Sequence, residues 1–324
     1  MTSGTLAGQR CLVLGAGGFI GFNLCRALAA AGARVHGFGR TPKFGEPPTT
    51  ETWTNAEFGD HLALRRAVEG MEVVFHLLGG SIPGEAERDP VGDLRTNAVG
   101  SLELLSLCQS MGVHRLVFVS SGGTIYGPTA VSPISEDHPT NPISVYGIHK
   151  LLIEKHLGMH IHRDSMQAMV LRAANPYGPY QRPGRGQGLV VNLITRRLAG
   201  QPVEIWGDGS TVRDYLHVDD LVRAMLAAAV YEGPYRLMNV GSGIGRSINE
   251  VVAAVDQVLG LSGAEVRHLP GRAADVPSNV LDVSRIRTEL GWSAQIGWLN
   301  GLRHTADWVL GKSGSGGPAV RPAP

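Results

Sequence analysis

A tyrosine and a lysine four positions apart are the residues of this sequence best suited to chemistry. Tyr146 and Lys150 belong to the run Tyr-Gly-Ile-His-Lys, and residues with this spacing share one face of a helix. A nearby ammonium favours the charged form of a phenol, so we expect Lys150 to lower the pKa of Tyr146 and make it a base. An alcohol that loses its hydroxyl proton to this base can release a hydride from the carbon that bears the oxygen. We expect His149, inside the run, to be a surface side chain.

Hydroxyl side chains precede this pair in the segment Ser-Ser-Gly-Gly-Thr-Ile-Tyr-Gly, residues 120–127. The segment follows a short apolar run, which places it at the carboxyl end of an expected strand. Ligands of open parallel sheets bind at that end. The hydroxyls of this segment are therefore expected to hydrogen-bond the same reacting oxygen as Tyr146.

A glycine-rich turn near the N-terminus has the spacing of a dinucleotide-binding loop. Gly15, Gly18 and Gly21 lie between an apolar run and a helical pattern. The first permits a tight turn, the second lets the backbone approach a pyrophosphate, and the third lets helix and strand pack closely. The phosphates then bind free N–H groups at the positive end of the helix, beside Phe19 and Ile20. This context favours a dinucleotide site over a merely flexible turn.

The end of the second expected strand bears on the choice of cofactor. An acid there normally binds the adenosine ribose of NAD, but this chain has Gly39 and Arg40. Arg40 can neutralise a 2′-phosphate, so NADP stays open beside NAD; alternatively it stacks on adenine or points into solvent. Asp60, ahead of an apolar helical run, either contacts adenine or caps that helix.

Apolar runs of strand length alternate with helical patterns along the chain, which predicts an α/β fold with a Rossmann-type doubly wound parallel sheet. The expected strands are Arg10–Leu14, Arg34–Phe38, Val73–Leu77, Leu116–Ser120 and Ala168–Arg172. The expected helices run from the glycine turn to about Ala31, over Asp93–Met111 with Gly112 as C-cap, and onward from about Val145. These elements bring the three motifs to one edge of the sheet.

The amino-acid composition and the length of the expected elements change along the chain. We expect an NAD(P)-binding Rossmann domain over 1–178. From about Gly178 the chain is rich in glycine, proline and arginine and then has shorter elements, which indicates a smaller C-terminal substrate-binding lobe over 179–310, interleaved with the first domain. The low-complexity segment 311–324 is predicted to be a disordered tail.

Composition argues against several functional classes. The 324 residues have a formal net charge of +1, so nucleic acid or a membrane is not expected as a partner. Cys11, Cys25 and Cys108 lie in apolar segments without metal-ligand spacing, so we expect reduced core residues and no metal. With no leader-like N-terminus and no long apolar run, we predict a cytosolic protein.

The order and spacing of the motifs from about Cys11 to Trp308 resemble the extended short-chain dehydrogenase/reductase family, within it the nucleotide-sugar 4-epimerases, UDP-glucose 4-epimerase-like with relatives acting on UDP-glucuronate. The resemblance rests on the three glycines, Gly59-Asp60, Asn97, the 120–127 segment, Tyr146 with Lys150, Asn175-Pro-Tyr-Gly178, the run 207–219, and Arg272 with Asp275. Each motif alone is weak evidence for the family, but the whole set in this order is highly specific for it.

The resemblance implies contacts with two ligands. Leu77 and Asn97 would join the glycine turn at the cofactor. The nucleotide sugar would be held by Ser81 at the sugar, by Asn175, Arg213 and Arg272 at the diphosphate, by Gly188 and Val190 as a cover, and by Asp275 at the uridine ribose. Guanidinium groups suit this role because they bind phosphate bidentately. The alternative for the two arginines is a structural ion pair with a neighbouring acid.

The chain departs from the family at Gly122, where a serine or threonine usually helps to hold the sugar O4. We predict that Thr124 takes this role, with Ser121 as the second candidate. The dehydratases of the family have an Asp-Glu pair where this chain has Gly123-Thr124. Without an acid to protonate a departing C6 hydroxyl, 4,6-dehydration is disfavoured.

The resemblance thus implies an NAD-dependent nucleotide-sugar 4-epimerase that inverts C4 of a UDP-hexose or UDP-hexuronate through a 4-keto intermediate. An NADPH-dependent 4-ketoreductase shares these residues and suits Arg40. A non-catalytic redox sensor that only binds dinucleotide would be expected to lose Tyr146 or Lys150.

The charge of the sugar depends on the arginines of one loop. Arg182 and Arg185 are candidates to pair with a C6 carboxylate, but loop arginines are more often solvated, which favours a neutral hexose. In look-alikes the helices 93–111 and 145–162 form a homodimer interface, so we expect a homodimer.

Overall fold

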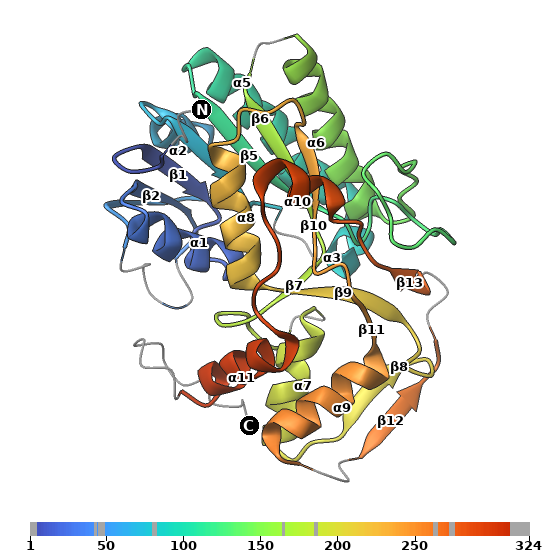
Figure 1. The fold of residues 1–324 in the computed structure, drawn as a ribbon. Helices are drawn as coiled ribbons and strands as arrows, with labels where there is room; N and C mark the ends of the chain where they lie inside the picture. The colour runs from blue at the N-terminus through green and yellow to red at the C-terminus, as the bar shows by residue number, and fades with distance from the viewer. Residues whose placement is uncertain are drawn as a thin grey trace.

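The computed structural model describes residues 5–41, 44, 49–79, 83–163, 166–184, 187–261, 265–271 and 276–311. These residues form a large parallel sheet covered by helices and, beside it, a smaller lobe with short sheets (Figure 1). Several residues named by the sequence lie outside the described residues: Ser81, Arg185, Arg272, Asp275 and 312–324 of the predicted tail.

The main sheet has the strand order β3-β2-β1-β4-β5-β6-β10, and each neighbouring pair is parallel. Its strands are β1 (Arg10–Leu14), β2 (Arg34–Gly39), β3 (Thr52–Asn55), β4 (Val73–His76), β5 (Arg115–Ser121), β6 (Ala168–Ala173) and β10 (Leu237–Val240). The order reverses between β1 and β4, and open α/β sheets bind ligands at such a switch point. The predicted doubly wound α/β class is confirmed.

Helices cover both faces of this sheet, which explains why its strands are nearly all apolar. Along β1, Cys11 and Val13 enter one core, whereas Leu12 and Leu14 enter the other. The first core is closed by α1 (Phe19–Ala30), α8 (Val218–Ala229) and α10 (Ser284–Leu290). The second is closed by α2 (His61–Val68), α5 (Gly100–Ser110) and α6 (Val145–His162).

The helix predicted over Asp93–Met111 is present but is not uniform. It starts as α4 (Pro90–Asp93), continues as a π-helix, η1 (Leu94–Val99), and ends as α5. The C-cap is Met111, and the predicted Gly112 follows it with a φ of +68°, the left-handed conformation that favours glycine after a helix. The sequence did not predict the π turn, and such turns frequently occur at functional sites. The short helix α3 (Pro83–Arg88) precedes this segment.

The smaller lobe is built around one long strand. Its strands are β7 (Asn175–Tyr177), β8 (Val203–Trp206), β9 (Val212–His217), β11 (Gly245–Ser247), β12 (Val266–Leu269) and β13 (Ser278–Asn279), and its helices are α7 (Leu189–Leu198), α9 (Ile248–Leu259) and α11 (Trp298–Val309). The long strand β9 pairs with β7, β11 and β13. Because β10 and α8 return from this half of the chain to the main sheet, we propose an interleaved lobe with its boundary near residue 178.

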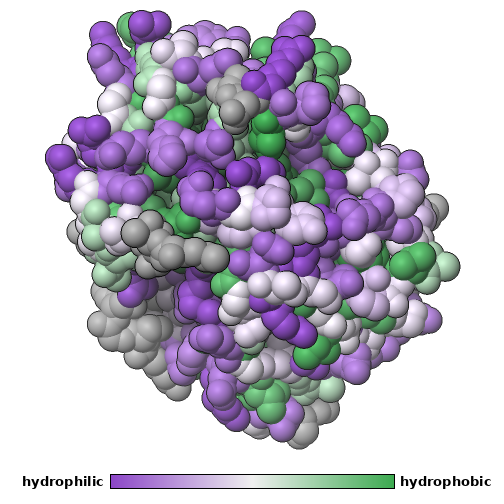
Figure 2. Space-filling model, turned by 45° about the horizontal axis from the view of Figure 1, so that its top comes forward, coloured by the Kyte–Doolittle hydropathy of each residue, from purple (hydrophilic) through white to green (hydrophobic). Residues whose placement is uncertain are grey.

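The outside of the molecule is mixed in character. The face in Figure 2 is dominated by hydrophilic side chains, with apolar residues scattered among them. Within the described ranges, no helix combines the length and apolarity needed to cross a membrane.

The three cysteines lie in the interior. Cys11, Cys25 and Cys108 are free and buried, as predicted, and burial raises the pKa of each thiol to about 12.

Candidate active site

A cavity of roughly 1340 Å³ lies between the carboxyl edge of the main sheet and the smaller lobe. One wall consists of the glycine turn and the ends of β4, β5 and β6, and the opposite wall of residues from α7, β8 and β9. Predicted site residues in its lining are Gly15, Gly18, Phe19, Ile20, Gly21, Leu77, Ser121, Thr124, Tyr146, Lys150, Asn175, Gly188, Val190 and Arg213. The fold therefore gathers most of the predicted site around one space.

The glycine turn forms a cradle that side chains would fill. Gly15 has a φ of +88°, and a Cβ added to Gly21 would lie 2.2 Å from the carbonyl oxygen of Gly15. Gly18 is the N-cap of α1 and brings no side chain to the N–H groups of the first turn. This geometry fits the pyrophosphate of NAD, because the backbone and the positive end of the helix face the cavity.

Three residues predicted at the cofactor lie outside the cavity lining. Arg40 is exposed one residue beyond β2. Asp60 caps α2, where its carboxylate accepts from the N–H of Ala63 at 2.9 Å, so the capping interpretation is confirmed and an adenine contact stays a prediction. Asn97 is buried in η1, and its Nδ2 donates to Oδ1 of Asp93 at 2.6 Å.

The tyrosine and the lysine lie on α6, whose N-cap Ser144 accepts from the N–H of Gly147 at 3.2 Å. The Nζ of Lys150 donates to the carbonyl of Val119 at 3.0 Å and lies 5.8 Å from the centre of the Tyr146 ring. The predicted pair therefore faces the cavity from one side of the helix, with the ammonium held against β5.

The charge balance of this pair differs from the prediction. We expected Lys150 to lower the pKa of Tyr146, but burial and the nearby carboxylate of Asp93 raise it to about 12. Burial also lowers the pKa of Lys150 to about 8, against a pull upward from Glu154 and Asp93. Both groups are therefore biased toward their neutral forms, and Tyr146 needs a further positive charge beside it to act as a base at neutral pH.

The predicted hydroxyls lie at the end of β5. The Oγ1 of Thr124 is buried in the cavity wall and has no hydrogen-bond partner among the described residues; the same holds for the Oγ of Ser120. A buried hydroxyl without a partner is costly, and a ligand oxygen would satisfy it. The space beside Gly122 is already filled, since an added Cβ would lie 2.6 Å from Cδ1 of Leu281. A side chain at this position, where the family usually has a hydroxyl, would therefore require Leu281 to move.

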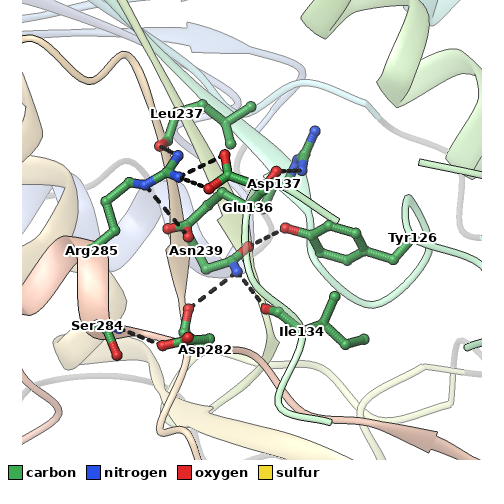
Figure 3. A network of polar contacts seen from close by, with 10 residues as sticks. Tyr126, Ile134, Glu136, Asp137, Leu237, Asn239, Asp282, Ser284 and Arg285 are labelled. Atoms are coloured by element: carbon green, nitrogen blue, oxygen red, sulfur yellow. Dashed lines mark hydrogen bonds and ion pairs between the residues drawn. The ribbon is translucent and has the colours of Figure 1, made fainter. Parts of the chain in front are cut away.

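A buried polar network holds this hydroxyl segment in place (Figure 3). Tyr126, two residues after Thr124, donates from its hydroxyl to Oδ1 of Asn239 at 2.6 Å. The backbone N–H of Asn239 donates in turn to Glu136 at 2.8 Å, and its Nδ2 donates to backbone carbonyls of Ile134 and Asp282. The network thus ties the end of β5 to β10 and to the chain before α10. The sequence did not predict it.

The lobe wall carries the predicted diphosphate contacts. The Nη1 of Arg213 donates to the carbonyls of Val212 and Val276 at 2.9 and 2.7 Å, which orients the guanidinium in the cavity wall. Asn175 donates from Nδ2 to the carbonyl of Asp214 at 3.0 Å. Gly188 is the N-cap of α7 and has a φ of +80°, a conformation that favours glycine.

Some functional candidates were missed by the sequence. His149 is only 9% exposed, so the expectation of a surface residue is wrong. Its Nδ1 lies 2.5 Å from Oδ2 of Asp93, a partner 56 positions away, and such a pairing has no local sequence pattern. Glu87 of α3 lines the cavity and accepts from the N–H of Val145 at 2.8 Å, next to Tyr146.

Two other predictions concern ions and charged sugars. The guanidinium of Arg182 lies 5.4 Å from the centre of the Phe44 ring, outside the cavity lining, and its pairing with a C6 carboxylate stays a prediction. In the described part of the chain, no cluster of three or more His, Cys, Asp or Glu side chains is placed to hold a metal ion.

Comparisons with known proteins agree on one family. The model of the NAD dependent epimerase/dehydratase family matches residues 11–241. The UDP-glucose 4-epimerase of Mycolicibacterium smegmatis is 34% identical over 313 residues, which cover 94% of this chain and 100% of that protein. The solved UDP-glucose 4-epimerase of Thermotoga maritima, with UDP-glucose, has a TM-score of 0.88 at 33% identity and covers 94% of this chain and 99% of its own. MoeE5, solved with UDP-glucuronic acid and NAD, has a TM-score of 0.83 at 33% identity, covering 93% and 98%.

Proposed function

The chain belongs to the NAD-dependent epimerase/dehydratase family, and from this premise we propose that it is an NAD-dependent nucleotide-sugar 4-epimerase. The observation that carries the proposal is the unpartnered buried hydroxyl of Thr124 in the same cavity wall as Tyr146, Lys150 and the glycine cradle. These groups converge where a sugar hydroxyl would meet a base, a hydrogen-bond donor and a dinucleotide.

The residues that line the cavity have separate roles in the proposed reaction. The glycine cradle would hold NAD⁺, which when bound would provide a hydride acceptor and a positive charge near the phenol. Tyr146 takes the proton of the sugar O4 and returns it to the same oxygen after the 4-keto sugar has turned over. Lys150 provides an ammonium beside the phenol, and Thr124 donates to the reacting oxygen. Arg213 holds the diphosphate, so that the sugar turns while the nucleotide stays bound.

The same residues argue against dehydration. Thr124 and Gly123 stand where the dehydratases of the family have an acid pair, so this part of the cavity wall brings no carboxylic acid to a departing C6 hydroxyl. A reductase that uses NADPH is the second candidate, because Arg40 follows β2 where a 2′-phosphate would lie. Arg40 is exposed and outside the cavity lining, which makes this the weaker case.

We propose a neutral UDP-hexose rather than a UDP-hexuronate as substrate. Glu87 lines the cavity close to Tyr146, and a sugar carboxylate beside it would meet a like charge. The other charged residues of the described lining are Lys150, Arg196 and Arg213. Of these, Arg196 already donates to the carbonyl of Pro202 at 2.7 Å and pairs with Glu204.

Two measurements test this function. The purified protein is denatured and the released nucleotide identified; we expect NAD⁺ held from expression, whereas an empty site that needs added NADPH would support a reductase. The protein is then incubated with UDP-glucose alone, and we expect UDP-galactose without added cofactor. UDP-glucuronate should be converted much more slowly. Failure to convert any UDP-hexose, with NAD⁺ bound, would overturn the epimerase proposal.

We also propose that the protein is a cytosolic homodimer. Val91 on α4, Leu94 and Val99 on η1 and Ile148 on α6 are large apolar residues that remain exposed, between 37% and 57%. Exposed apolar residues on neighbouring helices are typical of a subunit interface. Light scattering should give twice the chain mass, and a monomer at micromolar concentration would exclude this assembly. Buried free cysteines fit a reducing compartment.

A further inference from the structure

A buried acid–base pair lies directly behind the catalytic helix. Asp93, at the end of α4, is 6% exposed and accepts hydrogen bonds on both carboxylate oxygens. Oδ1 accepts from Nδ2 of Asn97, and Oδ2 lies 2.5 Å from Nδ1 of His149. An ionised carboxylate only accepts, so the imidazole nitrogen is the donor. His149 occupies the position immediately before Lys150 on α6.

The surroundings of this pair are fixed by a chain of buried contacts. The carbonyl of Asn97 accepts from Oγ of Ser101 at 2.5 Å, and that hydroxyl lies 2.8 Å from Nε2 of His76. The π-helical segment η1 carries Asn97, and it separates α4 from α5. The carboxylate therefore has little freedom to move away from α6, and its charge acts at a fixed place.

The charge of Asp93 acts on both catalytic groups. It raises the pKa of Tyr146 and also supports the ammonium of Lys150. Among the described residues, the titratable side chain in direct contact with Asp93 is His149 on α6. His76 on β4 is linked to it only through Ser101 and Asn97, and Glu87 on α3 contacts the backbone N–H of Val145 instead. Burial keeps His76 neutral by lowering its pKa to about 3, so it adds no charge at neutral pH. His149 is thus the basic side chain that lies directly against this carboxylate.

We propose that Asp93 and His149 form an ionic positioning pair in which the imidazolium of His149 cancels the carboxylate that would otherwise oppose formation of the Tyr146 phenolate. Asp93 holds Lys150 charged, and His149 prevents the same carboxylate from keeping Tyr146 protonated. Neither residue of the pair lines the cavity in the described part of the chain, so both act through the catalytic pair. The proposal rests on the proposed function for the role of Tyr146 as the base and for the identity of the substrate.

Single and double substitutions separate this role from simple packing. Asp93→Asn removes the negative charge, so the acidic limb of the kcat/KM profile should move to lower pH by about 1 unit. His149→Asn keeps a hydrogen-bond donor but removes the positive charge, and the limb should move to higher pH by a similar amount. The double variant removes both charges and should return toward the wild type, as a double-mutant cycle of a coupled pair predicts. His162→Asn, at the exposed end of α6, is the control and should leave the profile unchanged.

A second readout does not depend on turnover. The ultraviolet absorbance of phenolate is titrated in the NAD⁺-bound protein, and the curve of each variant is compared with the same variant carrying Tyr146→Phe. The difference reports Tyr146 alone, and its midpoint should move in the same two directions. If no UDP-sugar is converted, the proposed epimerase function is wrong, but this titration still tests the Asp93–His149 pair.

Shifts in the same direction for both single variants, or none in either, would overturn the proposal. Equal loss of rate at every pH would also overturn it, because that result indicates a packing role. If Asp93→Asn does not fold, the titration of His149→Asn decides alone: an upward shift supports the pair and an unchanged midpoint refutes it.

Discussion

The two walls of the cavity are held in different ways. On the main-sheet wall the polar groups are fixed from within that half of the molecule: Lys150 donates to the carbonyl of Val119, and Tyr126 bonds Asn239. On the lobe wall Arg213 is oriented by the carbonyls of two different chain segments, at Val212 and Val276. The first wall places groups with perturbed pKa values around the reacting atom; the second presents a guanidinium to an anion.

This difference separates chemistry from binding. Burial biases Tyr146 and Lys150 toward their neutral forms, so small changes of charge nearby have large effects on the proton step. A guanidinium at a diphosphate instead contributes about equally to the bound substrate and to the transition state. Substitutions on the main-sheet wall are therefore expected to change kcat, and those on the lobe wall to change KM.

The largest effect is expected from Tyr146→Phe. Loss of the hydroxyl removes the proton acceptor but retains the ring, so kcat should fall by about 10²–10⁴-fold with the fold and bound NAD⁺ unchanged. Steady-state kinetics and the released nucleotide measure both. Tyr235→Phe, at a ring that is 44% exposed, is the control. If Tyr146→Phe keeps more than about a tenth of the activity, another group is the base.

Lys150→Met should make the protein more stable while it abolishes activity. The pKa of Lys150 is lowered from 10.5 to about 8, so the fold opposes its charged form. This penalty is complete below pH 8 and fades as the pH rises from about 8 to 10.5. Denaturant unfolding should show a gain of about 2 kcal/mol at pH 7, after allowance for the lost bond to Val119, and no gain above pH 10.5.

For comparison, Lys155→Met on the exposed side of α6 should show no such pH dependence. A gain at pH 7 that persists unchanged to high pH would mean that burial of the charge is not its cause.

Arg213→Leu tests the lobe wall. Loss of a charge-assisted contact should weaken binding by about 1.5–3 kcal/mol, or roughly 10- to 150-fold in KM, with kcat nearly unchanged. Calorimetric titration with UDP measures the same loss without turnover. Arg303→Leu, at an exposed position of α11, is the matched control. A fall in kcat with KM unchanged would remove the distinction between the two walls.

The smallest effect is expected from the hydroxyl at the end of β5. Thr124→Val keeps the shape of the side chain and removes its hydrogen bond, so kcat should fall about 10-fold, by about 1–1.5 kcal/mol. Ser121→Ala should cost less. Presteady-state rates of the chemical step compare the two. Kinetics of Thr124→Val equal to those of the wild type would transfer the role to Ser121 or to water.

The sequence alone determined the fold class and most of one wall. The spacing of the three glycines, the apolar runs and the tyrosine–lysine pair each require only local geometry: a tight turn, a strand covered on both faces, one side of a helix. For this reason β1 and α6 were predicted at their observed bounds or start, and the glycine turn, Thr124 and Tyr146 line one cavity.

Tertiary structure alone decided the electrostatics. The pKa of Tyr146 is set by burial and by Asp93, which comes from another helix, and His149 is buried against that same carboxylate. Likewise, the space beside Gly122 is filled by Leu281, which is far away in the sequence. Residue type and spacing specify which groups can ionise, but the free energy of a charge depends on the water excluded around it and on charges brought near by packing. That information is present only when the distant segments have folded together.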